Sequence, residues 1–247
     1  MAAKNVTMFA GKGGVGKSFI AANLGYALSL QNQRVAIWDA DSVFPNQHLI
    51  FGVEPPNRLN DVYSGKISLD FCASEVFPNL DLYADRPSLG KVDKYAPAEL
   101  AKIHAKLSKS GKYDFIIIDS AAGVSKSLVY ASHFANINAV IVTDEPTSIL
   151  DAYGLIKILI RIVGKEKFKL IVNNIIDLDD VNEIWNKIKL ATNKFLGFKI
   201  DLLGYSIYDR AVKMSIVRQE LYIQTNPETE TAENIKQIAL DLIALNK

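Results

Sequence analysis

A glycine-rich segment near the N-terminus, Gly11 to Ser18, constrains the fold of this chain more than any other feature. It reads GKGGVGKS and fits the pattern G-x-x-x-x-G-K-[ST], a loop that cradles the phosphates of nucleoside triphosphates. Val6 to Ala10 predicts a short buried strand before it, and the helix formers from Phe19 to Leu30 predict a helix after it. This order suits the motif, because the glycines let backbone N–H groups point at an anion and the helix adds its positive N-terminal end.

Three polar side chains of the loop have separate expected tasks. Lys17 is the lysine of the motif and is predicted to reach the β- and γ-phosphates, while the Ser18 hydroxyl is predicted to bind Mg²⁺. Lys12 is an additional lysine, which the standard motif does not require. From the residues alone it is either a solvated loop lysine or a cation that serves a different phosphate.

Three aspartates stand at the ends of apolar segments. Arg34 to Asp39 predicts a second strand, and alternation along the chain puts Asp39 and Asp41 on one side, towards the ligand crevice. The alternative is a strand-end turn that uses aspartate for local hydrogen bonds. Tyr113 to Asp119 is apolar on both faces, as in a central parallel strand, and an aspartate at such an end is typical of the carboxylate that holds the water shell of Mg²⁺.

Strands and helices alternate along the rest of the chain. The predicted strands are 80–84, 139–143, 168–173 and 202–205, and the predicted helices are 47–51, 59–64, 97–108, 125–135, 148–163, 179–195, 210–219 and 230–245, with a polar loop at 86–95. Such alternation implies right-handed crossovers. We therefore expect an α/β P-loop NTPase fold, with a mostly parallel twisted sheet, helices on both faces, and one domain spanning residues 1–247.

Composition excludes several classes of protein. The 247 residues carry a net charge of +1, which argues against a global field for nucleic acid or an anionic membrane. Cys72 is the single cysteine, so no intrachain disulfide forms, and we expect a small buried side chain in a reducing cytosol. No apolar signal segment or membrane-length span is visible, and the three histidines lack metal-ligand spacing.

Taken together, these motifs resemble the deviant Walker A ATPases of the MinD/ParA group. Within that group the chain looks most similar to the MinD-type flagellar number regulators (FlhG, also called FleN or YlxH). The stretches that carry this are Asp119 to Ser125 (DSAAGVS), Glu145 to Lys157 (EPTSILDAYGLIK), Leu203 to Asp209 (LGYSIYD) and the helix from Arg210 to Gln219. The resemblance runs from about Val6 to about Leu245.

The resemblance implies a site and a mechanism. Lys12 is the signature lysine that reaches nucleotide in the opposite subunit of a head-to-head homodimer, Asp41 orients or activates the attacking water, and Asn173 reaches the adenine. The implied catalytic residues are Lys12, Lys17 and Asp41, and those around Mg²⁺ are Ser18, Asp39 and Asp119. The implied nucleotide-binding residues are Gly11, Lys12, Gly13, Gly14, Val15, Gly16, Lys17, Ser18, Phe19 and Asn173.

Two segments depart from the family pattern. Ser42 to Pro45 replaces the small and apolar residues usual after D-x-D, which leaves the behaviour of the switch loop and the hydrolysis rate open. Members often end in a separate basic membrane-targeting helix, whereas here the last predicted helix has a mixed polar face. Its apolar stripe, Ile235, Ile238, Ala239, Leu242 and Ile243, is interpreted as core, with a weak membrane anchor as the alternative.

The expected function is an ATP-switched dimer that hydrolyses ATP to ADP and phosphate and sets the number or placement of flagella or another structure. A flagellar GTPase or regulator is the implied partner.

The alternative function is a ParA-like positioner of cargo or DNA, for which the candidate basic patch is Lys157, Arg161, Lys165, Lys167 and Lys169. A metal-cluster maturation ATPase would need a cysteine pair, and a nonhydrolysing adaptor would rest on the unusual switch loop. The expected location is the cytoplasm, and the alternative is a peripheral position at the inner face of the cell membrane.

Overall fold

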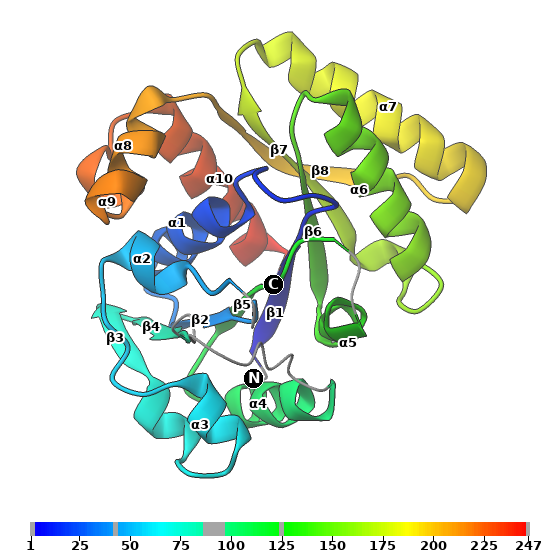
Figure 1. Ribbon diagram of the computed structural model, residues 1–247. Coiled ribbons are helices and arrows are strands. Elements are labelled where there is room, and N and C mark those ends of the chain that lie inside the picture. The colour runs from blue at the N-terminus through cyan, green and yellow to red at the C-terminus, as the bar shows by residue number, and fades with distance from the viewer. Residues whose placement is uncertain (1–2, 42–43, 86–96, 124–125, 246–247) are drawn as a thin grey trace.

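The computed structural model describes residues 3–41, 44–85, 97–123 and 126–245 (Figure 1). Its eight strands form one sheet in the order β3-β4-β2-β5-β1-β6-β7-β8, in which β3 alone runs antiparallel to its neighbour. The strands are β1 (Lys4–Phe9), β2 (Val35–Asp39), β3 (Ser74–Phe77), β4 (Leu80–Tyr83), β5 (Phe115–Asp119), β6 (Ile137–Val142), β7 (Phe168–Ile175) and β8 (Asp201–Ile207). The predicted α/β fold with a mostly parallel sheet is confirmed.

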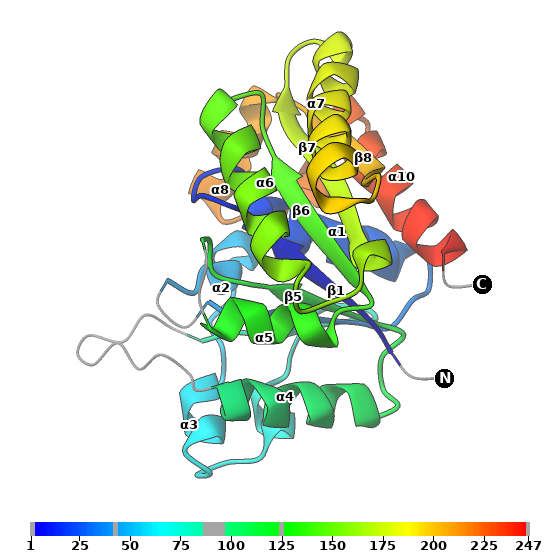
Figure 2. The same cartoon turned by 90° about the vertical axis from the view of Figure 1, so that its right-hand side faces the viewer.

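Helices cover both faces of the sheet, as Figures 1 and 2 show. One face holds α1 (Lys17–Leu30), α2 (Gln47–Phe51), α8 (Arg210–Arg218), α9 (Tyr222–Thr225) and α10 (Glu230–Ala244). The other holds α3 (Leu59–Tyr63), α4 (Pro97–Lys109), α5 (Lys126–Phe134), α6 (Pro146–Leu159) and α7 (Leu178–Leu196). Two 3₁₀ turns, Leu69–Cys72 and Lys165–Lys167, complete the elements.

The central strands explain why the sheet is buried on both sides. In β5, Phe115 and Ile117 point into the core that contains α1 and α10, while Ile116 and Ile118 point into the core that contains α3 and α4. All four side chains are fully buried, because consecutive residues of a strand face opposite ways. This arrangement puts β1 between β5 and β6, so the loop that follows β1 lies at the middle of the sheet's carboxyl edge.

The C-terminal helix is a core element. Its stripe members Ile235, Ile238, Ala239 and Leu242 are at most 1% exposed, and α10 packs against β8 and α1. The core interpretation is confirmed, because burying the stripe completes the hydrophobic core. A weak membrane anchor formed by this helix, exposed on dimerisation, stays a prediction. Within the described segments, no helix combines the length and apolarity needed to cross a bilayer.

Several elements differ from the sequence predictions. Strand β3 and helix α9 were not predicted, because β3 is a short, half-exposed edge strand and α9 has only four residues. Most other elements agree to within a few residues, and β7 and β8 run further than predicted. The predicted loop at 86–95, the first two residues of the Ser42 to Pro45 departure and the end of the DSAAGVS stretch lie outside the described residues. That residues 1–247 form a single domain stays a prediction.

Candidate functional site

The glycine-rich loop joins β1 to α1 and needs glycine at two turns. Gly14 and Gly16 have φ angles of 83° and 85°, which side-chain-bearing residues rarely adopt. Gly16 is also crowded, since a Cβ there would lie 2.2 Å from the Asn173 side-chain nitrogen. That nitrogen, Nδ2, donates to the Val15 carbonyl oxygen at 2.8 Å and so ties the loop to β7. The strand–loop–helix context predicted for the motif is present.

Lys17 lies at the start of α1 and is buried. Its Nζ forms an ion pair with Asp119 Oδ1 at the end of β5, and the side chains are 9% and 1% exposed. Lys17 Nζ also lies 3.4 Å from Ser18 Oγ. A buried ammonium without a partner is costly, so Asp119 compensates Lys17 in this arrangement. The structure thus brings together the three residues that the sequence assigned to phosphate and Mg²⁺ at this end of the loop.

Asp39 and Asp119 are neighbours across the sheet. They are register partners of the parallel strands β2 and β5, and each is 1% exposed. Three backbone N–H groups donate to the Asp39 carboxylate, from Asp41 at 3.1 Å, Asn46 at 2.9 Å and Gln47 at 3.0 Å. Burial, followed by the charge of Asp119, nevertheless raises the pKa of Asp39 to about 7.

This donor set suits Mg²⁺. Two adjacent buried carboxylates repel each other, and a divalent cation removes that repulsion. The oxygens of Asp39, Asp119 and Ser18 are hard donors of the kind Mg²⁺ prefers, and Mg²⁺ normally keeps several waters. Across residues 3–41, 44–85, 97–123 and 126–245, no group of three or more His, Cys, Asp or Glu side chains is placed to hold a metal.

Two adjoining cavities open along the loop. The first, of about 410 Å³, is lined by Lys12, Gly13, Gly14, Val15, Gly16, Lys17, Ser18, Phe19, Asp41, Asn46, Leu49, Ile50, Ala122 and Ile216. Asp41 is half-buried there, and its Oδ1 accepts a hydrogen bond from the Phe44 N–H at 3.0 Å. The backbone of the glycine-rich loop, both lysines and the predicted water-orienting carboxylate therefore share one chamber.

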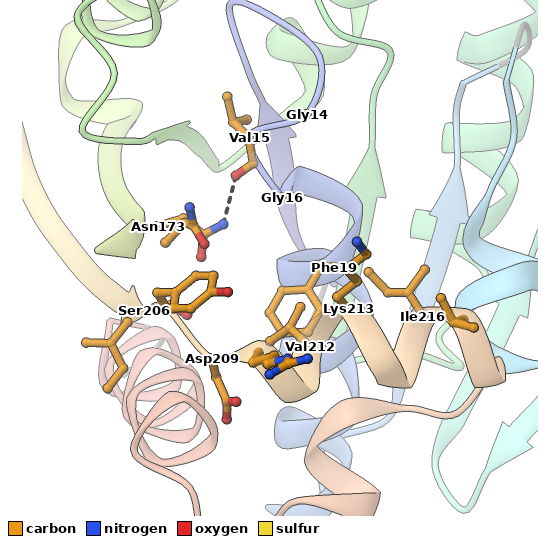
Figure 3. Close-up of a pocket in the computed structure, with 15 residues that line it drawn as sticks. Gly14, Val15, Gly16, Phe19, Asn173, Ser206, Asp209, Val212, Lys213 and Ile216 are labelled. Carbon is orange, nitrogen blue, oxygen red and sulfur yellow. Dashed lines mark hydrogen bonds between the residues drawn. The ribbon is translucent and has the colours of Figure 1, made fainter. Parts of the chain in front are cut away.

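The second cavity, of about 650 Å³, lies between α1 and α8 (Figure 3). Asn173, Phe19, and Val212 and Ile216 of α8 line it, with Phe19 next to Val212. Its mixed apolar and amide lining suits a planar heterocycle next to a phosphate loop. Of the predicted nucleotide residues, Gly14, Val15, Gly16, Phe19 and Asn173 line this cavity.

Lys12 points to a different partner from Lys17. Its Nζ forms an ion pair with Glu145 Oε2, just before α6, and donates to Thr147 Oγ1 at 3.1 Å. The side chains of Lys12 and Glu145 are 28% and 60% exposed, so solvent reaches this pair, and Lys12 also lines the first cavity. Glu145 and Thr147 belong to the EPTSILDAYGLIK stretch, which gives that motif a contact with the loop.

Comparison with known proteins identifies the family. The CbiA family profile, described as the CobQ/CobB/MinD/ParA nucleotide binding domain, matches residues 6–220. This chain belongs to the CobQ/CobB/MinD/ParA nucleotide-binding family. Its relatives in this family include "Antiactivator FleN" of Pseudomonas aeruginosa, 28% identical over 95% of this chain and 84% of that protein. "Flagellum site-determining protein YlxH" of Helicobacter pylori is 27% identical over 96% and 80%. The predicted resemblance is confirmed.

Solved structures of this family have the same fold. The MinD cell division protein of Aquifex aeolicus superimposes with a TM-score of 0.81 at 25% identity, covering 98% of this chain and 97% of that one. MinD of Pyrococcus horikoshii, solved as a complex with Mg-ADP, superimposes with a TM-score of 0.82 at 22% identity, covering 99% and 97%. The similarity to the Pyrococcus horikoshii structure supports the assignment of the fold.

The sequence predictions missed two polar residues near the site. Gln47, the first residue of α2, is fully buried and contacts both Ser18 and Asp119. Asp209 caps α8 by accepting from the Ala211 N–H at 2.7 Å, and Tyr222 donates to its other oxygen. Their signal in the sequence was weak, because Gln47 is a glutamine in an apolar helix and Asp209 is an aspartate that precedes a helix. Only their position beside the loop distinguishes them.

Proposed function

We propose that this protein is an ATP-dependent dimerising switch that hydrolyses ATP to ADP and phosphate. The observation that carries the proposal is the position of Lys12, which lines the same chamber as Lys17 and Asp41 while its Nζ pairs with the exposed Glu145. A lysine so placed can serve a phosphate in a facing subunit, whereas Lys17 serves its own. Family membership supports nucleotide as the ligand.

Apolar side chains at the same opening support a self-complementary contact. Leu49 and Ile216 line the phosphate chamber and are 44% and 42% exposed, and Phe44, after Asp41, is 75% exposed. Exposed apolar groups around a site favour a protein partner over solvent. In a two-fold dimer the apolar surface of one subunit contacts the same surface of the other subunit, which would bring the two Lys12 side chains to the interface.

Each site residue has a proposed task. Backbone N–H groups of the loop bind the phosphates, and Lys17 neutralises them by exchanging its contact with Asp119 for a phosphate oxygen. Asp119, Asp39 and Ser18 would hold Mg²⁺, which supplies positive charge to the phosphates. Asp41 would orient the attacking water, and Asn173 and Phe19 would hold the base.

The proposed cellular role follows the relatives. Proteins named antiactivator FleN and flagellum site-determining protein YlxH match nearly the whole chain, so we propose control of flagellar number or placement. A flagellar GTPase or regulator would be the partner, and a cytoplasmic or membrane-peripheral location would follow. A ParA-like role on DNA has less support, because Lys169 is paired with Asp201 and Lys165 contacts the Gly197 carbonyl oxygen.

The decisive experiment measures mass in solution. We expect the wild-type protein to dimerise with ATP and Mg²⁺ and to be monomeric with ADP, as measured by light scattering after size exclusion. Lys12→Ala should bind ATP with little change yet stay monomeric, and Asp41→Ala should form a dimer that persists because hydrolysis is lost. Lys187→Ala, which removes an exposed cation on α7 that lines neither cavity, serves as the control for charge removal. A Lys12→Ala protein that dimerises like the wild type would exclude the lysine-in-trans mechanism.

A further inference from the structure

Gln47 contacts all three residues that are predicted to surround Mg²⁺. Its side-chain Nε2 donates to Asp119 Oδ2 at 2.7 Å and to the Ser18 carbonyl oxygen at 3.1 Å. Its backbone N–H donates to Asp39 Oδ2 at 3.0 Å. The residue is fully buried, so these hydrogen bonds form away from bulk water. One residue therefore connects the ends of β2 and β5 with the start of α1.

The orientation of the carboxamide follows from its neighbours. A carboxylate and a carbonyl can only accept hydrogen bonds, so the NH₂ group must face Asp119 and Ser18. The carbonyl oxygen Oε1 is then left buried, without a hydrogen-bond partner in the part of the chain that the structure describes. A buried amide oxygen normally has a donor, from protein or from ordered water. A cation that keeps its water shell supplies such donors.

We propose that Gln47 is a positioning residue for the divalent cation of the nucleotide site. Its NH₂ group holds Asp119 Oδ2 while Lys17 contacts Oδ1, so the carboxylate plane stays fixed when Lys17 turns to phosphate. Its backbone N–H holds Asp39 in the same way, and Oε1 would be available to accept a hydrogen bond from the water shell of a bound cation. This inference rests on the nucleotide and cation site proposed above.

The chemistry of the contact favours this role over a purely structural one. A fixed carboxylate loses less rotational freedom on binding a cation than a free one, so a positioned partner raises affinity. If Gln47 only filled space, an apolar residue of the same length would serve equally well, because the hydrogen bonds of the carboxamide would then contribute nothing to cation binding. Removing its hydrogen bonds should therefore weaken cation binding while leaving the phosphate loop and its glycines in place.

The test compares ADP affinity with and without the cation. In wild-type protein, a fluorescent ADP analogue is titrated in EDTA and in Mg²⁺, and the ratio of the two Kd values gives the coupling. Gln47→Leu should reduce this coupling about tenfold or more, with the EDTA affinity within about twofold of wild type. Mn²⁺ binding without nucleotide, followed by electron paramagnetic resonance, should weaken by a similar factor.

Ser132→Ala is the matched control. The Ser132 hydroxyl is fully buried on α5 and donates to the Val129 carbonyl oxygen at 2.7 Å, away from the loop. Its loss should lower the melting temperature without changing the Mg²⁺ coupling. If Gln47→Leu does not fold, Gln47→Met replaces it, since methionine has the same length and an unbranched chain.

The outcomes separate the two proposals. A Gln47 variant with a lowered melting temperature but unchanged coupling and Mn²⁺ affinity has lost only structural support, and the inference is overturned. Wild-type protein that binds no ADP would overturn the proposed function, and Gln47 would still be judged by Mn²⁺ binding alone. Wild-type protein that binds neither would overturn both.

Discussion

Lys12, the second lysine of the phosphate loop, forms an ion pair with Glu145 of the same chain. A lysine that serves a facing subunit must first leave this partner. Because Glu145 is 60% exposed on its side chain, the pair contributes at most about 1 kcal/mol. Because two such pairs are released per dimer, we expect Glu145→Gln to favour the ATP dimer by no more than about thirtyfold, measured as the dimer Kd by analytical ultracentrifugation. A loss of dimerisation would instead show that Glu145 itself contacts the partner copy.

The buried pair of Lys17 and Asp119 should behave differently. Among the described residues, Lys17→Met leaves the buried Asp119 carboxylate with Gln47 as its one side-chain donor, so the free energy of unfolding should fall by about 3–5 kcal/mol. The double variant Lys17→Met/Asp119→Asn removes the uncompensated charge and should recover part of that loss. Urea denaturation in EDTA measures both. A double variant as unstable as the sum of the single variants contradicts the coupling.

Asp39 should make the cation-free protein less stable as the pH rises. Burial beside Asp119 raises the pKa of Asp39 from 3.8 to about 7, so the folded state binds a proton that the unfolded state has lost. The resulting stabilisation is complete below about pH 4 and disappears as the pH passes about 7. Between about pH 5 and pH 8 this amounts to roughly 2 kcal/mol. Melting curves in EDTA should show a smaller decline for Asp39→Asn, and Mg²⁺ should stabilise the wild type most at the higher pH.

Gly16 and Gly13 form a matched pair for testing the loop backbone. Gly16 has a φ of 85° and a Cβ there would meet Asn173, whereas Gly13 has no atom within 4 Å of that position. Gly16→Ala should cost at least about 1–2 kcal/mol of stability and most of the nucleotide affinity. Gly13→Ala should change stability by less than about 0.5 kcal/mol. Calorimetric titration with ATP and thermal melts distinguish them, and equal effects would mean that backbone conformation is unimportant at Gly16.

Ile238 tests the assignment of the C-terminal helix to the core. It is 1% exposed and packs against Gly204 of β8, where a Cβ would lie 2.4 Å from its side chain. Ile238→Ala should reduce the free energy of unfolding by about 2–5 kcal/mol because it leaves a cavity. Binding to anionic vesicles, if any is measured for the wild type, should not depend on this residue while the protein is folded. A stable Ile238→Ala protein would argue that the stripe leaves the core.

Local signals predicted much of the fold. The glycines and the lysine of the loop, the apolar strands and the aspartates after them are neighbours in the chain, so their spacing predicted the central strands and most helices. Edge strand β3 and short helix α9 lack such a signal, since tertiary contacts stabilise them rather than their own propensity. Asn173 was placed near nucleotide by family resemblance, and the structure adds its hydrogen bond to Val15.

The sequence by itself determined the phosphate loop, the type of fold and the family, because each depends on residues at fixed short spacing. Only the tertiary structure decided which side chains meet: Lys17 with Asp119, Lys12 with Glu145, and Gln47 with Ser18 and Asp119. Those pairs are separated by 29 to 133 residues along the chain. The register of parallel strands and the packing of α2 and α6 on them set such contacts, and no local pattern encodes them.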